Sequence, residues 1–212
     1  MADLRTLHDA ILEGNAKQAA ALTQEALAEG LAPLDIIQQA MVPAMDEVGR
    51  RFECEEYFVP ELLLSARAMK AALEPVRPLL VASGIQPAGR VVIGTVKGDL
   101  HDIGKNLVAA LLEGGGFEVI DLGADVPAQK FVEAVQSSGA GIVALSALLT
   151  VTMPSMKSTI EALDHAGVRS RVKVIVGGAP VTQQFADQIG ADGYSENATA
   201  AVALARRLSQ PA

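Results

Sequence analysis

The stretch VVIGTVKGDLHDIGKN, residues 91–106, decides the fold of this chain. Its first six residues are an apolar run of strand length, and a helical pattern begins at Ile103. Between them lies a polar turn with His101 at its centre, flanked by Asp99 and Asp102. The stretch therefore predicts a strand, a turn and a helix, with a histidine where the strand ends.

The same alternation continues to the end of the chain. Strands are expected at 91–96, 117–123, 140–149, 172–180 and 191–195, and helices at 105–115, 127–139, 154–167, around 183–190 and at 197–209. Strict alternation of strand and helix implies a parallel sheet covered on both faces, wound in the flavodoxin or Rossmann manner. We therefore expect a five-stranded α/β domain over residues 90–212.

The first part of the chain differs in its glycine content. Of the 19 glycines, only those at 14, 30, 49 and 84 precede residue 86. Apolar residues recur there at helical spacing over 4–14, 16–30, 33–52 and 60–80. Short connections predict antiparallel neighbours, so residues 1–85 should form a four-helix bundle cap, with a kink at Pro43. The stretch 79–90 reads as a connection, and residues 86–89 are taken as the linker.

Composition limits the possible partners and the location. The net charge is −8 over 212 residues. Residues 1–85 carry 7 Lys and Arg against 13 Asp and Glu, a balance of −6, which leaves −2 for the rest. An acidic chain without a basic patch gives no electrostatic footprint for nucleic acid or anionic lipid. The single cysteine, Cys54, fits a reducing compartment, and no apolar run approaches the ~20 residues of a membrane span. We expect a cytoplasmic protein.

His101 lies just past a strand end, where the carboxyl ends of parallel strands form the ligand crevice. A histidine beside two acids is usually a solvated loop residue. Here Asp99 can accept from one ring nitrogen while the other points outward, an arrangement common for metal-bound imidazole. Gly98 and Gly104 remove side chains on either side, as a broad rigid ligand would require. The other crevice loops, 146–152 and 177–180, consist largely of small and hydroxyl residues.

Several chemistries do not fit this histidine. A zinc site needs clustered ligands, yet His8 and His165 fall in expected helices and Cys54 in the other half. The chain has no G-x-S-x-G elbow for a serine hydrolase, and neither G-x-G-x-x-G nor a Walker sequence follows the first strand. A metal held inside a bound macrocycle, with His101 as one axial ligand, fits better.

Three motifs give a family resemblance. The chain reads Asp99-Leu-His101-Asp-Ile-Gly104, then 41 residues, Ser146-Ala-Leu148, 28 more residues, and Gly177-Gly178. This pattern resembles the cobalamin-binding module of the corrinoid methyltransferases. Residues 47–70 are similar to the helical cap that precedes this module in cobalamin-dependent methionine synthase. The whole chain looks most like the free-standing corrinoid proteins of anaerobic methyl-transfer systems.

The resemblance implies a role for each matching residue. His101 would be the lower axial ligand of cobalt, displacing the dimethylbenzimidazole of the cofactor. Asp99 would hold the other imidazole nitrogen, and the Thr152 hydroxyl would bond that aspartate; these three would form the catalytic relay. Other cofactor contacts are implied at Gly98, Asp102, Ile103 and Gly104 of the histidine loop, at Ser146, Leu148, Thr150, Gly177, Gly178 and Ala179 along the channel for the nucleotide tail, at Tyr194 and Ala198 on its far wall, and at Phe52 and Val59 above the cobalt.

The resemblance also implies a function. The protein would carry a methyl group on cobalt, between a methyltransferase specific for methanol, a methylamine or an aryl methyl ether and a second one that uses tetrahydrofolate or a thiol. A reductive activating protein would be a third partner. The chain would be a subunit and substrate of these enzymes more than an enzyme itself. A cobalamin-binding regulator or photosensor is the alternative, although no basic helix-turn-helix segment is visible. A B12-dependent mutase subunit and a flavin or nucleotide binder are further options.

Overall fold

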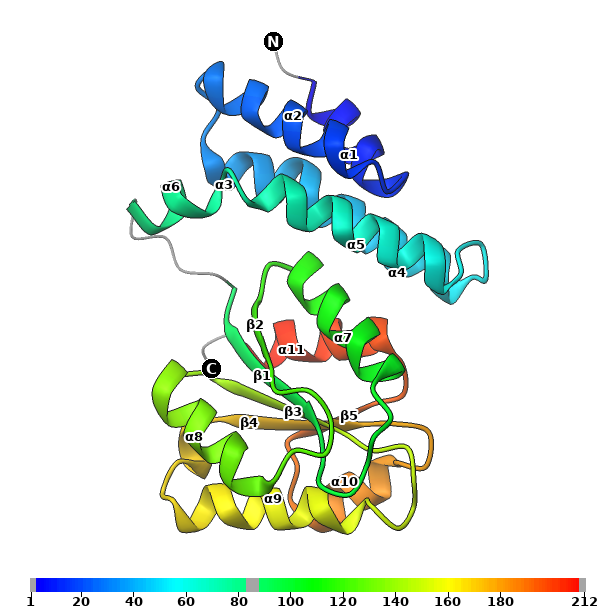
Figure 1. Cartoon of the computed structure of the whole chain (residues 1–212), viewed down its shortest axis with the longest axis vertical. Coiled ribbons are helices and arrows are strands. Elements are labelled where there is room, and N and C mark those ends of the chain that lie inside the picture. Colours follow the sequence, from blue (N-terminus) through cyan, green and yellow to red (C-terminus); the bar gives the residue numbers. More distant parts are fainter. Residues whose placement is uncertain (1–2, 83–87, 210–212) are drawn as a thin grey trace. The chain divides into compact units, whose positions relative to one another are not determined.

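The computed structural model describes residues 3–82 and 88–209, which fall into two compact units. One unit contains the helices that precede residue 88, together with the short segment 113–116, and the other is an α/β unit (Figure 1). The predicted linker, 86–89, lies partly outside the described residues, so the domain boundary stays a prediction.

The helical unit is built on α1, which packs against α2, α4 and α5, while α2 also packs against α5. Gly14 and Gly30 follow the first two helices with φ of 73° and 86°, as their positions in the sequence predict. The elements are α1 (Leu4–Leu12), α2 (Ala16–Ala28), α3 (Pro33–Ile36), η1 (Ile37–Met41), α4 (Val42–Glu53), α5 (Val59–Leu73) and α6 (Arg77–Ala82).

Two details of this unit differ from the sequence prediction. The irregularity expected at Pro43 takes the form of a π-helical turn, η1, in which the Val42 N–H reaches the carbonyl of Ile37. The expected fourth helix ends at Leu73, because Pro75 lacks a backbone donor and its ring clashes with a preceding carbonyl. Part of the expected connection, Leu79–Ala82, instead belongs to α6.

The α/β unit alternates strands and helices as predicted. One short 3₁₀ turn, η2, was not expected, and β3 ends at Ser146, three residues before the expected end. The elements are β1 (Arg90–Thr95), α7 (Ile103–Gly114), β2 (Glu118–Asp121), α8 (Ala128–Ser138), β3 (Ile142–Ser146), α9 (Pro154–His165), η2 (Arg169–Arg171), β4 (Lys173–Gly177), α10 (Gln183–Ile189), β5 (Gly193–Ser195) and α11 (Ala198–Ser209).

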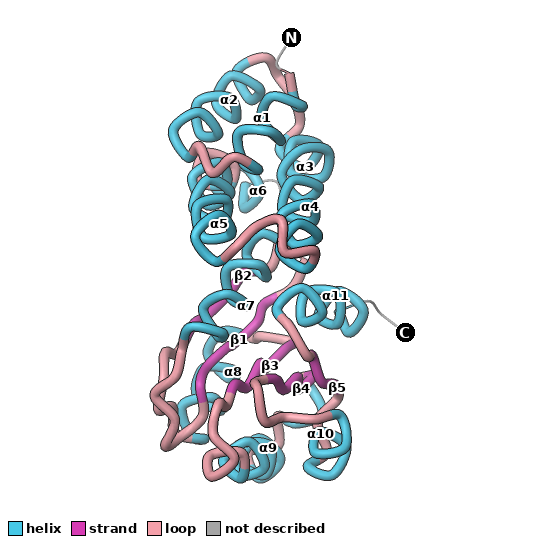
Figure 2. Tube along the Cα trace, turned by 90° about the vertical axis from the view of Figure 1, so that its right-hand side faces the viewer, coloured by secondary structure: helices cyan, strands magenta, loops and turns pink. Residues whose placement is uncertain are grey.

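The strands form one parallel sheet in the order β2-β1-β3-β4-β5. In Figures 1 and 2, α7 and α11 cover one face and α8, α9 and α10 the other. This is the doubly wound order of flavodoxin-like folds, and it confirms the predicted fold class. The chain adds β2 on one side of β1 and β3 on the other, so the order of strand addition reverses between β1 and β3. Such folds bind ligands at this switch point.

The core of the α/β unit explains one glycine of β1. Phe131 of α8 is fully buried among Val92, Val143 and Val176 of the sheet. A Cβ at Gly94 would lie 2.8 Å from the ring of Phe131. Gly94 therefore makes room for the fully buried ring of Phe131.

Candidate functional site

The carboxyl ends of the strands line up in one row of small side chains. Thr95 of β1 is in register with Ser146 of β3, which pairs with Gly177 of β4, and Gly177 pairs with Ser195 of β5. The loops that follow these residues therefore leave the sheet side by side.

His101 lies in the loop between β1 and α7, and its side chain is 51% exposed. Its Nδ1 lies 2.8 Å from Oδ1 of Asp99, and its backbone N–H donates to the same oxygen at 3.0 Å. Thr95 adds a third restraint, since its hydroxyl donates to the His101 carbonyl at 2.9 Å. A carboxylate at Nδ1 fixes the proton there, which leaves the lone pair on Nε2 for a ligand bond.

Asp99 is fully buried and connects this loop to the loop after β3. Its Oδ2 accepts from the backbone N–H groups of Leu148 at 2.8 Å and Leu149 at 3.2 Å, and from the Thr152 hydroxyl at 2.7 Å. Burial by itself raises the pKa of Asp99. The hydrogen bonds from Thr152, Leu148 and His101 outweigh burial and hold the pKa well below its usual range. The Asp99 carboxylate is thus charged, and both of its oxygens accept hydrogen bonds.

Thr152 makes the contact with Asp99 that the resemblance implies. Its hydroxyl also lies 2.8 Å from the carbonyl of Leu149. A hydroxyl has one proton to donate, and a charged carboxylate is a stronger acceptor than a carbonyl. The Thr152 hydroxyl therefore donates its hydrogen bond to Asp99. The Thr152 methyl group lies against Gly98, where an added Cβ would be 3.6 Å away in ordinary contact. The threonine therefore fits this position without displacing the loop.

The surface around His101 is open and apolar. Gly98 has φ of +88°, which only glycine adopts readily, whereas a Cβ at Gly104 would meet nothing within 4 Å. Leu100 and Ile103 are 77% and 73% exposed, and Leu148, Leu149 and Val151 of the β3 loop are exposed as well. Exposed apolar side chains gathered around one imidazole suit a broad, largely apolar ligand that also needs an axial nitrogen. A macrocycle-bound metal fits these residues.

The glycine pair after β4 has a structural reason of its own. Gly178 has φ of +131°, and a Cβ there would lie 1.9 Å from the carbonyl oxygen of Ala147. A Cβ at Gly177 would meet the Ser195 carbonyl at 3.0 Å. The resemblance implies that these glycines line the channel for the nucleotide tail, yet the fold requires Gly178 without any ligand.

The remaining predicted residues divide between the two units. Asp102, Thr150 and Ala179 are exposed in the loops at the carboxyl ends of the strands, a region called the sheet edge below. Tyr194 lies half-buried in β5, and Ala198 is buried at the first position of α11. Phe52, in the last turn of α4, and Val59, at the start of α5, belong to the helical unit. Their contact with a cofactor stays a prediction.

Two family models match the chain. Residues 89–203 match a B12 binding domain, and residues 3–76 match a second model also described as a B12 binding domain. The chain belongs to the B12-binding family. A corrinoid is therefore its cofactor, as the three motifs predicted.

Relatives of this B12-binding chain cover nearly its whole length. It is 45% identical over 207 residues to a dimethylamine corrinoid protein of Methanosarcina barkeri, with 97% of this chain and 96% of the relative aligned. Among solved structures, a cobalamin-binding protein from Desulfitobacterium hafniense is 34% identical with a TM-score of 0.79, covering 98% of this chain and 99% of that one. The methanol:cobalamin methyltransferase complex MtaBC from Methanosarcina barkeri contains a chain that is 33% identical, with a TM-score of 0.86, covering 97% of this chain and 79% of that one.

The sequence analysis did not identify three residues near the histidine loop. Thr95 holds the His101 carbonyl, and Asp125 bonds the loop from the β2 side. Lys105 is 2% exposed, with its Nζ paired to Asp121 and 2.7 Å from the Asn106 side chain. A lysine is rarely buried unless it is paired. The signal that could have revealed Lys105 is its place on the apolar face of the expected helix, where a lysine needs a buried partner.

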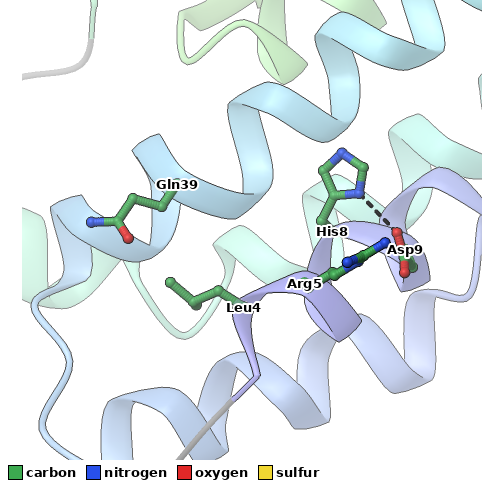
Figure 3. Close-up of a pocket in the computed structure, with 5 residues that line it drawn as sticks. All are labelled: Leu4, Arg5, His8, Asp9 and Gln39. Atoms are coloured by element: carbon green, nitrogen blue, oxygen red, sulfur yellow. Dashed lines mark hydrogen bonds and ion pairs between the residues drawn. The ribbon is translucent and has the colours of Figure 1, made fainter.

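Other hollows and clusters offer less chemistry. A pocket of about 380 Å³ in the helical unit is lined by Leu4, Arg5, His8, Asp9 and Gln39, with His8 and Asp9 3.0 Å apart (Figure 3). None of these is a predicted site residue. Within residues 3–82 and 88–209, no group of three or more His, Cys, Asp or Glu is arranged to hold a metal ion. In the same ranges, no helix is long and apolar enough to cross a bilayer. The cytoplasmic location stays a prediction.

Proposed function

We propose that this chain carries a methyl group on the cobalt of a corrinoid, between a donor-specific methyltransferase and an acceptor methyltransferase. The observation that supports this most is the His101 imidazole, held by a buried carboxylate at the open edge of a parallel sheet. When bound, the corrinoid supplies a cobalt atom that accepts and releases methyl groups.

The residues of the chain have distinct roles in this proposal. His101 would hold the cobalt through the lone pair of its Nε2, and Asp99 would keep the proton on Nδ1. Thr152 and the N–H groups of Leu148 and Leu149 hold Asp99 in place.

The partner enzymes follow from the relatives. One relative is a dimethylamine corrinoid protein, and a similar chain forms part of a methanol:cobalamin methyltransferase complex. These names support a methyltransferase partner and leave methanol, methylamines and aryl methyl ethers as donors to be compared. Tetrahydrofolate or a thiol is the proposed acceptor class, and a reductive activating protein is the proposed third partner.

The first experiment tests the cofactor bond. The purified full-length chain, prepared with 15N-labelled histidine, is loaded with hydroxocobalamin and reduced to the Co(II) state with titanium(III) citrate. Absorption and EPR spectra are then recorded for the wild type and for His101→Ala. We expect about one corrinoid per chain, with a splitting from the 15N of imidazole that is absent in the variant. Identical spectra of the two proteins would contradict the assignment of His101.

The second experiment tests the methyl transfer. The reduced, corrinoid-loaded chain is incubated with each donor and its methyltransferase, and the methylated cofactor is measured by absorption and mass spectrometry. A carrier becomes methylated with one class of donor and loses the methyl group to an acceptor enzyme. A sensor would bind the cofactor and respond to light without enzyme-dependent methylation, and that result would overturn the proposal.

A further inference from the structure

Asp125 lies in the loop between β2 and α8 and holds the histidine loop through two separate bonds. Its backbone N–H donates to the carbonyl of Asp99 at 2.9 Å, and its Oδ1 accepts from the backbone N–H of Gly98 at 2.8 Å. Its φ of 56° lies in the left-handed region, which few residues other than Gly, Asn and Asp adopt. This backbone conformation turns the N–H of Asp125 toward Asp99 and its carboxylate toward Gly98.

Lys97 completes the arrangement around Asp125. Its Nζ lies 2.9 Å from Oδ1 and 3.0 Å from Oδ2 of Asp125. The side chains are 59% and 39% exposed, so this ion pair contributes little by itself. The hydrogen bond from the Gly98 N–H and, to a smaller extent, that from Lys97 lower the pKa of Asp125. The Asp125 carboxylate is therefore charged near neutral pH.

The histidine loop is therefore held from two neighbouring strands. The β3 loop binds the side chain of Asp99 through Leu148 and Thr152, and Asp125 binds the backbone on either side of the Gly98–Asp99 peptide. His101 takes its own position from Asp99 through two bonds to one oxygen. A rotation of the Gly98–Asp99 backbone would move that oxygen and the imidazole with it.

We propose that Asp125 is a positioning residue for the axial histidine, acting through the backbone of Gly98 and Asp99. The inference rests on the proposed role of His101 as cobalt ligand. The acceptor oxygen of Asp125 and its left-handed backbone are the two features required, whereas its charge and the pair with Lys97 are secondary.

Three variants separate these features. Asp125→Gly keeps the left-handed backbone and the N–H but removes the acceptor. Asp125→Asn keeps the acceptor oxygen and tolerates the same φ, and Lys97→Gln removes only the ion pair. Asp192→Gly is the matched control, because Asp192 also accepts a backbone N–H, from Val174 at 2.7 Å, but at the opposite edge of the sheet, where β4 begins.

The main measurement is the fraction of histidine-ligated cobalt in the full-length chain loaded with cob(II)alamin. It is read from EPR of protein with 15N-labelled histidine, in which the histidine splitting differs from that of the 14N of dimethylbenzimidazole. For Asp125→Gly, the ratio of ligated to unligated cobalt should fall about tenfold, the effect expected from losing one hydrogen bond to a charged acceptor. Asp125→Asn, Lys97→Gln and Asp192→Gly should keep the wild-type ratio. Thermal denaturation of each variant separates a general loss of stability from this specific effect.

A second measurement needs no cofactor. Hydrogen exchange of the segment 96–103 should be faster in Asp125→Gly than in the wild type and unchanged in Lys97→Gln, because the Gly98 N–H loses its acceptor. Asp125→Ser, whose hydroxyl is shorter than a carboxylate, replaces the glycine variant if that variant does not fold, with the same expectation.

The outcomes are distinguishable. A wild-type ratio and wild-type exchange in folded Asp125→Gly would overturn the inference, and so would an equal loss of ligation in Asp125→Asn or in Asp192→Gly. If the wild type itself shows no imidazole nitrogen on cobalt, the proposed function of His101 fails. The exchange measurement then still decides whether Asp125 orders the loop.

Discussion

The loops at the sheet edge and the helical turn, defined as residues 47–59 where α4 ends and α5 begins, both carry residues predicted to contact the corrinoid. Different interactions order the two regions. At the sheet edge a fully buried carboxylate, Asp99, takes hydrogen bonds from two loops. In the helical turn the ordering charges are partly exposed: Arg50 and Arg51 both donate to Glu47, and Arg51 also donates to the hydroxyl of Tyr57.

This difference predicts which region keeps one geometry. Removing a partner from a buried network leaves donors without acceptors, which costs far more than breaking a solvent-exposed ion pair. Substitutions in the buried network or at the close backbone contacts of the sheet edge should therefore cause large losses of stability, and those in the helical turn small ones. Four substitutions test this, in decreasing order of expected effect.

Gly178→Ala should have the largest effect. The new Cβ would overlap the carbonyl oxygen of Ala147, from which it would be 1.9 Å away, and the φ of +131° is strained for any L residue. We expect a loss of more than about 3 kcal/mol in the free energy of unfolding, or no folded protein. Urea denaturation followed by circular dichroism measures it. Wild-type stability would mean that the β3 and β4 loops can separate, so that the sheet edge is not fixed.

Asp99→Asn should have the second largest effect, a loss of about 2–3 kcal/mol in the free energy of unfolding. Both oxygens of Asp99 face donors: His101 on one side, Leu148, Leu149 and Thr152 on the other. An amide must turn its NH₂ group toward one of these sets, which leaves buried donors facing each other. The change is thus more than a loss of charge. Thr152→Ser, which keeps the hydroxyl, is the control and should lose little; equal denaturation midpoints for Asp99→Asn and the wild type would show that the network is not a stabilising one.

Much of this site was predictable from sequence, for a local reason. The end of a buried strand, the polar turn and the D-x-H-x-x-G motif all lie within residues 91–106, and the rule for parallel sheets places such a turn in the crevice. The helical unit was predictable from apolar periodicity, apart from the breaks at η1 and Pro75, where proline competes with that pattern.

What the sequence did not reveal depends on contacts between distant segments. Asp125 meets Gly98 across 27 positions, and Lys105 meets Asp121 across 16. The requirement for Gly178 comes from the backbone of Ala147, which only the folded sheet brings close. Such residues look ordinary in a single sequence, because an acid after a strand or a lysine in a helix is usually solvated.

Gly104→Ala separates the fold from the ligand at the sheet edge. A Cβ there meets nothing within 4 Å, and the residue lies in the first turn of α7, so the stability of the chain should stay equal or rise by up to about 1 kcal/mol. If a corrinoid lies over this glycine, its affinity should fall about tenfold, equal to about 1.4 kcal/mol. Hydroxocobalamin binding followed by absorption measures the affinity. Unchanged affinity would remove Gly104 from the predicted contacts.

Glu47→Gln should have the smallest effect, and it tests the exposed side of the comparison through pH. Hydrogen bonds from Arg50 and then Arg51 lower the pKa of Glu47 to about 2. A carboxyl with a depressed pKa in the folded state stabilises the fold above its ordinary pKa of about 4.3, and this contribution is lost as the pH falls toward about 2. The melting temperature of the variant should therefore lie slightly below that of the wild type at pH 7, and the two should converge between about pH 4 and pH 2. Added salt should also narrow the difference in melting temperature at pH 7, because the side chains of both pairs stay partly exposed to solvent. Glu53→Gln, at an exposed position of the same helix, provides the control for loss of charge alone. A gap that persists at pH 2, or one as large as that of Asp99→Asn at pH 7, would show that the helical turn depends on this network as strongly as the sheet edge depends on Asp99.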